Sequence, residues 1–283
     1  MTFVALVTGA SSGIGEATAR RLATQQDTKL ILVARRKERL EVLARELGGD
    51  PMIISVDLTD ADAPALIAQT VEREYGALHL LVNNAGARWS TEFSEGGWEN
   101  VERHMRVNFE APLRLTEALL PLLRRTALEA VPGAAGMQAS NPESNPTHPP
   151  PPPSIVNVAS TSGRVARRGV GGYCASKFAL AGWSDALALE EAAHGVHVGL
   201  VMPGFISTEG FPQAELRAKP LTRWMVADTS VVVDAILAAG PGGRREVYAP
   251  RYYGLLAAMR VIAPRLLWRL MNRGTFTTAT HSN

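Results

Sequence analysis

Tyr173 and Lys177 are the residues of this 283-residue chain whose types and spacing most directly suggest chemistry. They lie four residues apart in a segment that we expect to be helical, so both side chains share one helical face. An ammonium beside a phenol stabilises the phenolate and lowers a pKa that is normally about 10. The pair is therefore a candidate acid/base near neutral pH, although Tyr–Lys pairs at this spacing also occur by chance.

Other polar residues are expected near this pair because they follow predicted strands. Ser160 follows a strand expected over 154–158, and Asn84 follows one expected over 78–82. The carboxyl ends of parallel strands meet at one edge of a sheet, so these side chains are expected in a common crevice. Asn108 lies inside a predicted helix although asparagine is a poor helix former; a plain surface asparagine is the alternative.

A glycine-rich segment follows the first predicted strand and opens a predicted helix. It contains Gly9, Ser11, Ser12, Gly13, Ile14 and Gly15. Its glycines allow the backbone to turn sharply and to approach a pyrophosphate, whose charge is then met by free amides and the helix dipole. The spacing G-x-x-x-G-x-G differs from the general G-x-G-x-x-G fingerprint, so a plain tight turn is the alternative interpretation.

The elements that must position these residues follow a regular alternation of short apolar runs and longer amphipathic stretches, which is typical of βαβ units. Strands are expected at 3–8, 29–33, 52–56, 78–82, 154–158, 196–201 and 246–248, and helices at 14–25, 36–47, 61–75, 97–126, 173–194 and 229–239. The predicted fold is α/β: a doubly wound, seven-stranded parallel sheet of Rossmann-like type in three α/β/α layers, with ligands at the carboxyl ends of the strands.

Two segments depart from this alternation. The proline-rich stretch 127–153 cannot continue a helix or join a central strand, and we expect it to be a disordered or polyproline II insertion in a single domain spanning 1–250. It precedes the amino end of a strand, at the edge opposite the ligand crevice, so we do not expect an active-site lid; an inert surface loop is favoured over a docking site for a proline-recognising partner. The segment 251–283 is expected to be a basic amphipathic extension that Pro264 splits; for 254–273, packing against protein is favoured over weak peripheral membrane contact.

Composition excludes several classes of protein. The 29 basic and 27 acidic side chains give a net charge of +2, which is too small for an electrostatic nucleic-acid binder. The single cysteine, Cys174, excludes a disulfide framework, and the histidines lack partners at ligand spacing, so no metal is expected. There is no leader and no run of about 18 apolar residues. We therefore expect a soluble cytoplasmic protein.

Six motifs, in their order and spacing, resemble the short-chain dehydrogenase/reductase family in its compact single-domain branch. The resemblance covers most of residues 2–250, apart from the proline-rich stretch. The motifs are the glycine-rich segment 8–15, Asn83-Asn84-Ala85-Gly86, Asn108, Ser160, Tyr173-x-x-x-Lys177 and Pro203-Gly204-x-x-x-Thr208.

The resemblance implies a dehydrogenase or reductase that interconverts a ketone or aldehyde and an alcohol by hydride transfer. It implies that Tyr173 is the acid/base, that Lys177 lowers the pKa of Tyr173 and binds the nicotinamide ribose, and that Ser160 polarises the substrate carbonyl. Asn108 is implied to hold a relay water. The cofactor contacts it implies are Gly9, Ser11, Ser12, Gly13, Ile14, Gly15, Asp57 at the adenine, Leu58, Asn84, Ala85, Gly86, Tyr173, Lys177, Pro203, Gly204, Ile206 and Thr208.

The end of the second predicted strand bears on the choice between the two nicotinamide cofactors. An NAD-preferring site places a carboxylate there to bind the ribose 2′-hydroxyl, whereas this chain has Ala34 followed by Arg35 and Arg36. A guanidinium suits a 2′-phosphate, and cations are otherwise disfavoured at a helix start. We therefore expect NADP(H) rather than NAD(H), with Arg35 the stronger candidate and a solvated helix start as the alternative.

The substrate is expected between the segments 87–96, 161–172 and 205–227. Their apolar side chains, which indicate a small to medium lipophilic substrate, are Trp89, Phe93, Val165, Val170, Phe205, Phe211, Trp224 and Met225. In the second segment, Arg164, Arg167 and Arg168 are expected either to attract a carboxylate or phosphate or to form a solvated surface.

Two other functions stay open: a sugar-nucleotide epimerase or dehydratase, which shares Tyr-x-x-x-Lys, and a non-catalytic NADP-binding regulator. The glycine spacing and the short region after Pro203-Gly204 disfavour the first. The intact set of catalytic residues disfavours the second. Related enzymes pair through the helices at 97–126 and 173–194, so the resemblance implies a homodimer or homotetramer.

Overall fold

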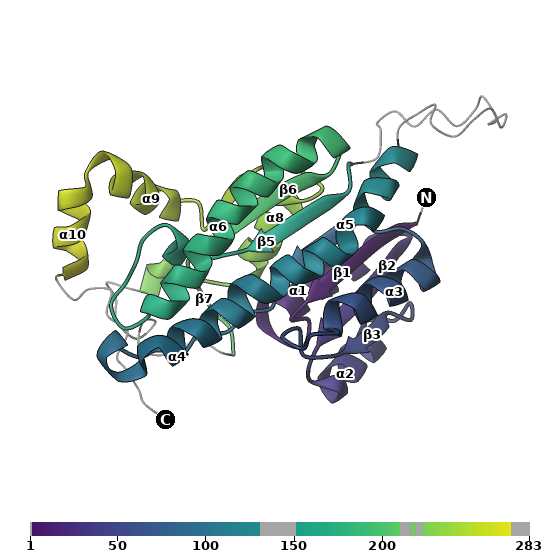
Figure 1. Cartoon of the computed structure of the whole chain (residues 1–283), viewed down its shortest axis with the longest axis horizontal. Helices are drawn as coiled ribbons and strands as arrows, with labels where there is room; N and C mark the ends of the chain where they lie inside the picture. Colours follow the sequence, from purple (N-terminus) through teal and green to yellow (C-terminus); the bar gives the residue numbers. More distant parts are fainter. Residues whose placement is uncertain (1, 131–150, 210–215, 217, 219–222, 273–283) are drawn as a thin grey trace.

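A twisted parallel sheet between two layers of helices forms the body of the molecule (Figure 1). The computed structural model describes residues 2–130, 151–209, 216, 218 and 223–272. The seven strands lie in the order β3-β2-β1-β4-β5-β6-β9, and all neighbouring pairs are parallel. Their bounds are β1 Phe3–Thr8, β2 Thr28–Ala34, β3 Met52–Ser55, β4 Leu80–Asn83, β5 Ser154–Val158, β6 His197–Pro203 and β9 Glu246–Ala249. The predicted doubly wound sheet is confirmed.

The helices cover both faces of this sheet. Their bounds are α1 Gly13–Ala23, α2 Lys37–Leu47, α3 Ala63–Tyr75, α4 Phe93–Met105, α5 Ala111–Glu129, α6 Gly171–Glu191, α8 Thr229–Ala239, α9 Tyr253–Ile262 and α10 Pro264–Asn272. One core packs α1, α2 and α8 against the sheet, and the other packs α3, α5 and α6. All helices expected from the sequence are present. They lie in these two layers, except α4, which packs beside α6.

The central strand β1 shows why the strands are apolar along their whole length. Ala5 and Val7 point into the core of α1, α2 and α8, whereas Val4 and Leu6 point into the core of α3, α5 and α6. Successive side chains of a strand point to opposite faces, so a strand covered on both faces needs an apolar residue at each position.

The helix expected over 97–126 is two helices joined by a π-turn at Arg106–Glu110, which contains Asn108. π-turns of this kind occur mostly as interruptions of helices at functional sites. The second helix, α5, runs to Glu129, so the expected start of the insertion at 127 is wrong. Ala127 is buried in the core, and Leu128 and Glu129 are good helix formers. Of the rest of the insertion, residues 131–150 lie outside the described residues, whereas 151–153 lead into β5 without regular structure and the Pro153 carbonyl accepts from the amide of His197 at 2.8 Å.

The segments after β6 complete the carboxyl edge of the sheet. A two-stranded ribbon, β7 Phe205–Ile206 and β8 Val226–Ala227, was too short to be expected from sequence pattern. Beyond β9 the chain forms α9 and α10, which separate at Pro264 as predicted. Tyr253 at the start of α9 is buried against Phe205 and Met225, so the C-terminal helices are anchored to this ribbon.

Candidate active site

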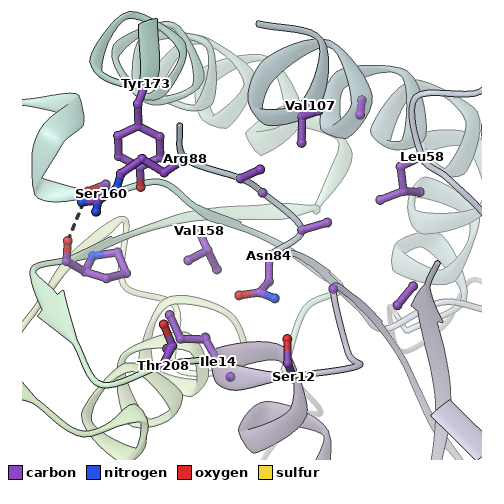
Figure 2. A pocket seen from close by; sticks show the side chains of 18 of the residues that line it. Ser12, Ile14, Leu58, Asn84, Arg88, Val107, Val158, Ser160, Tyr173 and Thr208 are labelled. Carbon is purple, nitrogen blue, oxygen red and sulfur yellow. Dashed lines mark hydrogen bonds between the residues drawn. The ribbon is translucent and has the colours of Figure 1, made fainter. Parts of the chain in front are cut away.

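A cavity of about 760 Å³ lies at the carboxyl edge of the sheet, where the sequence predicts the site. Figure 2 shows Tyr173, Arg88 and Ser160 on one side of it and Ser12, Ile14 and Thr208 on the other. Almost all candidate residues line it: Gly9, Ser11, Ser12, Gly13, Ile14, Arg35, Arg36, Asp57, Leu58, Asn84, Ala85, Gly86, Ser160, Tyr173, Lys177, Pro203, Gly204, Ile206 and Thr208. The two exceptions, Gly15 and Asn108, lie directly behind this lining.

The glycine-rich segment forms a tight turn held against the end of β4. The side chain of Asn84 donates to the carbonyl of Thr8 at 2.9 Å, and the Thr8 hydroxyl accepts from the backbone amides of Asn84 and Ala85 at 3.0 Å. Gly9 has φ +68°, and a Cβ on Gly15 would stand 2.3 Å from the carbonyl oxygen of Gly9. The glycines are therefore required by backbone conformation and close packing.

This turn fits the pyrophosphate of a dinucleotide. Helix α1 begins at Gly13, after Ser12 in extended conformation, so its free amides and the positive end of its dipole lie at the cavity wall. Gly13 has φ +58° and lies against Thr208. A backbone surface without side chains lets phosphate oxygens approach the amides, which supports a nucleotide rather than an apolar ligand here.

Arg35 and Arg36 lie where β2 ends, at the same end of the cavity as the glycine turn. Arg36 donates to the hydroxyls of Ser11 at 3.2 Å and Ser12 at 2.7 Å. Arg35 is largely exposed, and its guanidinium lies 3.4 Å from Asp57. Arg36 also lies 3.8 Å from Glu209, so two arginines and two carboxylates share this end of the cavity. The sequence favours Arg35, but Arg36 makes the closer contacts to the turn.

Asp57 is fixed by its own loop rather than by either arginine. Its Oδ1 accepts from the backbone amide of Thr59 at 3.0 Å and from the Thr59 hydroxyl at 2.8 Å. Partial burial acts to raise the pKa of Asp57, but the bonds from Thr59 and the charge of Arg35 outweigh it, and the pKa lies below its usual value. The carboxylate is therefore a fixed acceptor beside the expected adenine.

Tyr173 and Ser160 meet at the other end of the cavity. Tyr173 lies in the first turn of α6, half-buried, with its ring 6.1 Å from that of His104. Ser160 follows β5; its hydroxyl accepts from the amide of Ser162 at 3.1 Å and reaches the carbonyl of Pro203 at 3.5 Å (Figure 2). Burial raises the pKa of Tyr173, and a hydrogen bond from Ser160 and the charges of Arg167 and Arg88 oppose that rise.

Lys177 is one helical turn beyond Tyr173, as predicted, but its ammonium donates to a backbone carbonyl of β5. The Nζ atom donates to the carbonyl of Val158 at 2.9 Å, and burial lowers the pKa of Lys177 to about 8. The charges of Arg167 and Arg88 oppose the rise in the phenol pKa but do not reverse it. The sequence predicts a lowered pKa for Tyr173, whereas burial of the side chain outweighs the nearby positive charges and the pKa lies above its usual value; the role of Lys177 stays a prediction.

Asn108 positions the loop that follows β4. Its side chain donates to the carbonyl of Ala87 at 2.9 Å and to Ser176 at 3.1 Å, and accepts from the amide of Ala87 at 2.9 Å. A Cβ on Gly86 would stand 2.9 Å from the Asn108 oxygen and 3.6 Å from the Lys177 nitrogen. Asn108 thus joins the π-turn, α6 and this loop next to Lys177, while its water-holding role stays a prediction.

The expected substrate segments contribute unequally to the cavity. Trp89 and Phe205 line it, whereas Phe93 and Trp224 are 75% and 61% exposed and do not. Phe211 lies outside the described residues. The remaining three apolar candidates, Val165, Val170 and Met225, are buried. The wall also contains Arg88, which the sequence reading did not single out although it comes four residues after Asn84 at the end of β4.

The part of the chain that the structure describes contains neither a cluster of metal ligands nor a helix suited to cross a membrane. No group of three or more His, Cys, Asp or Glu side chains is placed to hold a metal ion. None of the described helices is both long and apolar enough to cross a membrane.

Comparisons with known proteins give a consistent result. Residues 3–130 and 152–218 match the family model described as short chain dehydrogenase. Nodulation protein G of Rhizobium sp. (strain N33) is 35% identical over 208 residues, which are 72% of this chain and 73% of that protein. The granaticin polyketide synthase putative ketoacyl reductase 1 of Streptomyces violaceoruber is 34% identical, covering 87% of this chain and 84% of its own. A short chain dehydrogenase from Burkholderia cenocepacia J2315, solved in complex with NADP, is 26% identical, with a TM-score of 0.75 over 98% of each chain.

Proposed function

The chain belongs to the short-chain dehydrogenase/reductase family, and from that premise we propose that it is an NADP(H)-dependent enzyme that interconverts a ketone or aldehyde and an alcohol on a small to medium lipophilic substrate. The observation that carries this proposal is the meeting of Tyr173, Ser160 and Lys177 at one end of a cavity whose other end is a phosphate-binding turn. A dinucleotide along the cavity would join the two ends.

The proposed reaction assigns proton transfer to Tyr173. The bound nicotinamide supplies or accepts the hydride. During reduction, the Tyr173 hydroxyl gives its proton to the carbonyl oxygen, which Ser160 orients by donating a hydrogen bond. Burial keeps the pKa of Tyr173 above its usual value, so the phenol is protonated and ready to act as the acid. In oxidation the same two residues act in reverse.

Lys177 and Asn108 are proposed to reload Tyr173 with a proton. A Lys177 pKa of about 8 lies near neutral pH, so this ammonium exchanges protons more readily than an ordinary lysine. Asn108 holds the neighbouring loop through Ala87, and we assign to it the relay water. Lys177 also binds the ribose in this proposal, with Thr208 at the carboxamide.

The proposed preference for NADP(H) rests on charge at the end of β2. Arg35 and Arg36 both line the cavity, and Ser11 and Ser12 add hydroxyl donors beside them. A 2′-phosphate dianion is bound well by guanidinium groups, whereas a 2′-hydroxyl gains little from them. The similar Burkholderia protein was solved with NADP, which agrees with this assignment.

Organisation beyond the single chain is also proposed rather than shown. We propose one domain over 1–250 with a C-terminal extension, a cytoplasmic location, and a homodimer or homotetramer that pairs through α4, α5 and α6. For α9 and α10, packing against protein is favoured over weak membrane contact because Tyr253 and Leu267 are already buried in the chain; the exposed apolar side chains Leu255, Val261, Ile262, Leu266 and Trp268 are then proposed to meet a partner subunit. Light scattering and flotation with anionic vesicles test the assembly and the membrane contact.

A spectrophotometric screen tests the proposed function. The purified enzyme is mixed with NADPH or NADH and a panel of ketones and aldehydes, and loss of the reduced cofactor is followed. We expect turnover of several lipophilic carbonyl compounds, with NADPH favoured. Binding of NADPH without turnover would support the regulator, and conversion of a nucleotide sugar without net cofactor consumption would support the epimerase or dehydratase.

A further inference from the structure

Three arginines follow β5 in the segment Arg164 to Arg168, and two of them are neutralised by carboxylates. Arg164 lies 3.2 Å from Asp185 and 3.4 Å from Glu246. Arg168 is 76% exposed and lies 2.8 Å from Glu92. Carboxylates therefore balance the charges of these two arginines in surface ion pairs, which contribute little to stability.

Arg167 differs from both of its neighbours. It is half-buried, donates to the neutral hydroxyl of Ser162 at 3.1 Å, and stacks at 4.8 Å over the ring of Phe205. Within the described residues it has no ion pair with a carboxylate. A guanidinium has five N–H groups in a planar fork, and a partly desolvated one without a counter-ion is costly. Desolvation accordingly lowers the pKa of Arg167.

The position of Arg167 assigns it to the substrate end of the cavity. It lines the cavity together with Ser160, Tyr173 and Phe205. Arg88 lines the same end, after β4, and Figure 2 draws it beside Tyr173 and Ser160. The charges of both arginines oppose the rise that burial causes in the pKa of the Tyr173 phenol, so their field reaches the place where a carbonyl would react.

The cavity therefore has arginines at two separate ends. Arg35 and Arg36 lie at the end of β2 and face the glycine-rich turn, which accounts for the phosphates of a dinucleotide. Arg167 lies at the other end, beside the proposed acid, where the cofactor phosphates are not expected. An anion at Arg167 must then belong to the substrate.

We propose that the substrate carries an oxyanion, a carboxylate or a phosphate monoester, which Arg167 binds while the carbonyl lies at Tyr173 and Ser160. This proposal rests on the proposed function and narrows its substrate to a lipophilic oxo compound with an anionic group. Arg88 adds positive potential at the same end, and Phe205 holds the Arg167 fork in a fixed plane by stacking. The planar fork suits bidentate binding of either oxyanion.

The test uses pairs of carbonyl compounds that differ only in charge. Oxo acids with increasing separation of the two groups, starting with levulinate, are compared with their methyl esters, and hydroxyketone phosphates with the free hydroxyketones. We expect the wild type to favour the charged member of the best pair by tenfold or more in kcat/KM, mainly through KM. Preference for acids or for phosphates distinguishes the two oxyanions.

Substitutions of Arg167 and of its neighbour Arg168 test which side chain causes the preference for charged substrates. Arg167→Met is expected to reduce the charged-to-neutral ratio of kcat/KM to about one, and Arg167→Lys to leave an intermediate ratio because the fork is lost. Arg168→Met, which removes the same charge from an exposed neighbour, is expected to leave the ratio unchanged. Equal use of both members by the wild type, or an equal loss for both in Arg167→Met, would overturn the proposal.

A binding measurement separates this proposal from the proposed function. Thermal melting is followed with levulinate or inorganic phosphate added to the wild type and to both Arg167 variants, with and without NADP⁺. Stabilisation of the wild type that is lost in Arg167→Met supports the anion site even if no carbonyl in the panel is reduced. If neutral ketones are turned over, but the anions neither stabilise the wild type nor improve a substrate, the proposed enzymatic function stands and the proposed anion site is rejected.

Discussion

The two ends of the cavity are built in different ways. At the proposed cofactor end, the phosphate-binding part is one short stretch of backbone, the turn after β1, beside the arginines at the end of β2, and residues that follow β3, β4 and β6 complete the lining. The substrate end brings together Arg88 after β4, Arg167 after β5, Phe205 in β7 and Tyr253 in α9, which are far apart in the chain. A phosphate is recognised by backbone amides, which a local motif specifies. A substrate is recognised by side chains that only the tertiary fold assembles.

Tyr173→Phe is the substitution expected to separate the two ends most strongly. It removes the proton donor at the substrate end but keeps the ring that packs near His104. Because general acid catalysis contributes about 10²–10⁴-fold, kcat should fall by about 10³-fold. The affinity for NADPH, measured by fluorescence titration, should stay within a few-fold. Retained turnover would remove Tyr173 from its assigned role, and lost NADPH binding would show that the two ends are not independent.

Lys177→Met tests the residue that lies between the two ends. We expect kcat/KM to fall by about 10²-fold, because the variant loses the proposed ribose contact and proton carrier. We also expect it to be more stable than the wild type at pH 7, by about 1–3 kcal/mol, because this buried ammonium has no carboxylate partner among the described residues and its burial is costly.

The pH dependence of this stability difference has a definite sign. The pKa of Lys177 is about 8 in the folded chain and about 10.4 in an unfolded chain. The unfolded state therefore binds more protons between these values, and wild-type stability rises with pH across that window. The advantage of Lys177→Met should be full below pH 8 and should vanish by about pH 10.4. Urea unfolding at several pH values measures it, with the exposed Lys37→Met as the control; a variant less stable than the wild type at pH 7 would contradict this account.

Arg35→Asp tests the charge at the cofactor end. The carboxylate repels a 2′-phosphate and can accept from a 2′-hydroxyl, so kcat/KM with NADPH should fall about 10- to 100-fold while that with NADH rises. Lys37→Asp makes the same charge change on an exposed side chain outside the cavity and should leave the ratio unchanged. An unaltered ratio in Arg35→Asp, together with a change in Arg36→Ser, would assign the phosphate contact to Arg36, which already reaches the turn.

Local pattern was sufficient for the sheet, the layers and the glycine-rich turn. β1 is apolar at each position because both of its faces are covered, and the turn that follows needs Gly9 at positive φ and Gly15 in close packing. Both requirements are visible in neighbouring residues. The break at Asn108 was visible only as a poor helix former, because the partners of its side chain, Ala87 and Ser176, are remote in sequence.

The substrate end could be predicted only in part for the same reason. The sequence offered Arg164, Arg167 and Arg168 as equivalent, and their difference arises from which carboxylates the fold places nearby. It also assigned Trp224 to the substrate wall, whereas the fold leaves that side chain exposed. Residue type and spacing predict neither the pairing of the arginines nor the exposure of Trp224, since both depend on segments that are distant in the chain.

Tyr253→Phe is expected to have the smallest effect, and it tests how the C-terminal helices support the substrate end. Tyr253 is 3% exposed, and its hydroxyl donates to the carbonyl of Met225 at 2.9 Å. Loss of this buried bond should lower the free energy of unfolding by about 1 kcal/mol. It should raise KM for the carbonyl substrate, because the lost bond to Met225 no longer fixes the ring that packs on Phe205, and leave NADPH affinity unchanged.

Tyr252→Phe provides the matched comparison for this last effect. Tyr252 donates to the carbonyl of Trp224 at the same 2.9 Å, but it is 37% exposed. Water can replace its bond, so the variant should lose less stability and keep its KM. If both variants behave alike, or if Tyr253→Phe weakens NADPH binding as much as substrate binding, the C-terminal helices support the whole cavity rather than the substrate end. Urea unfolding and steady-state kinetics of the two variants under one set of conditions decide between these outcomes.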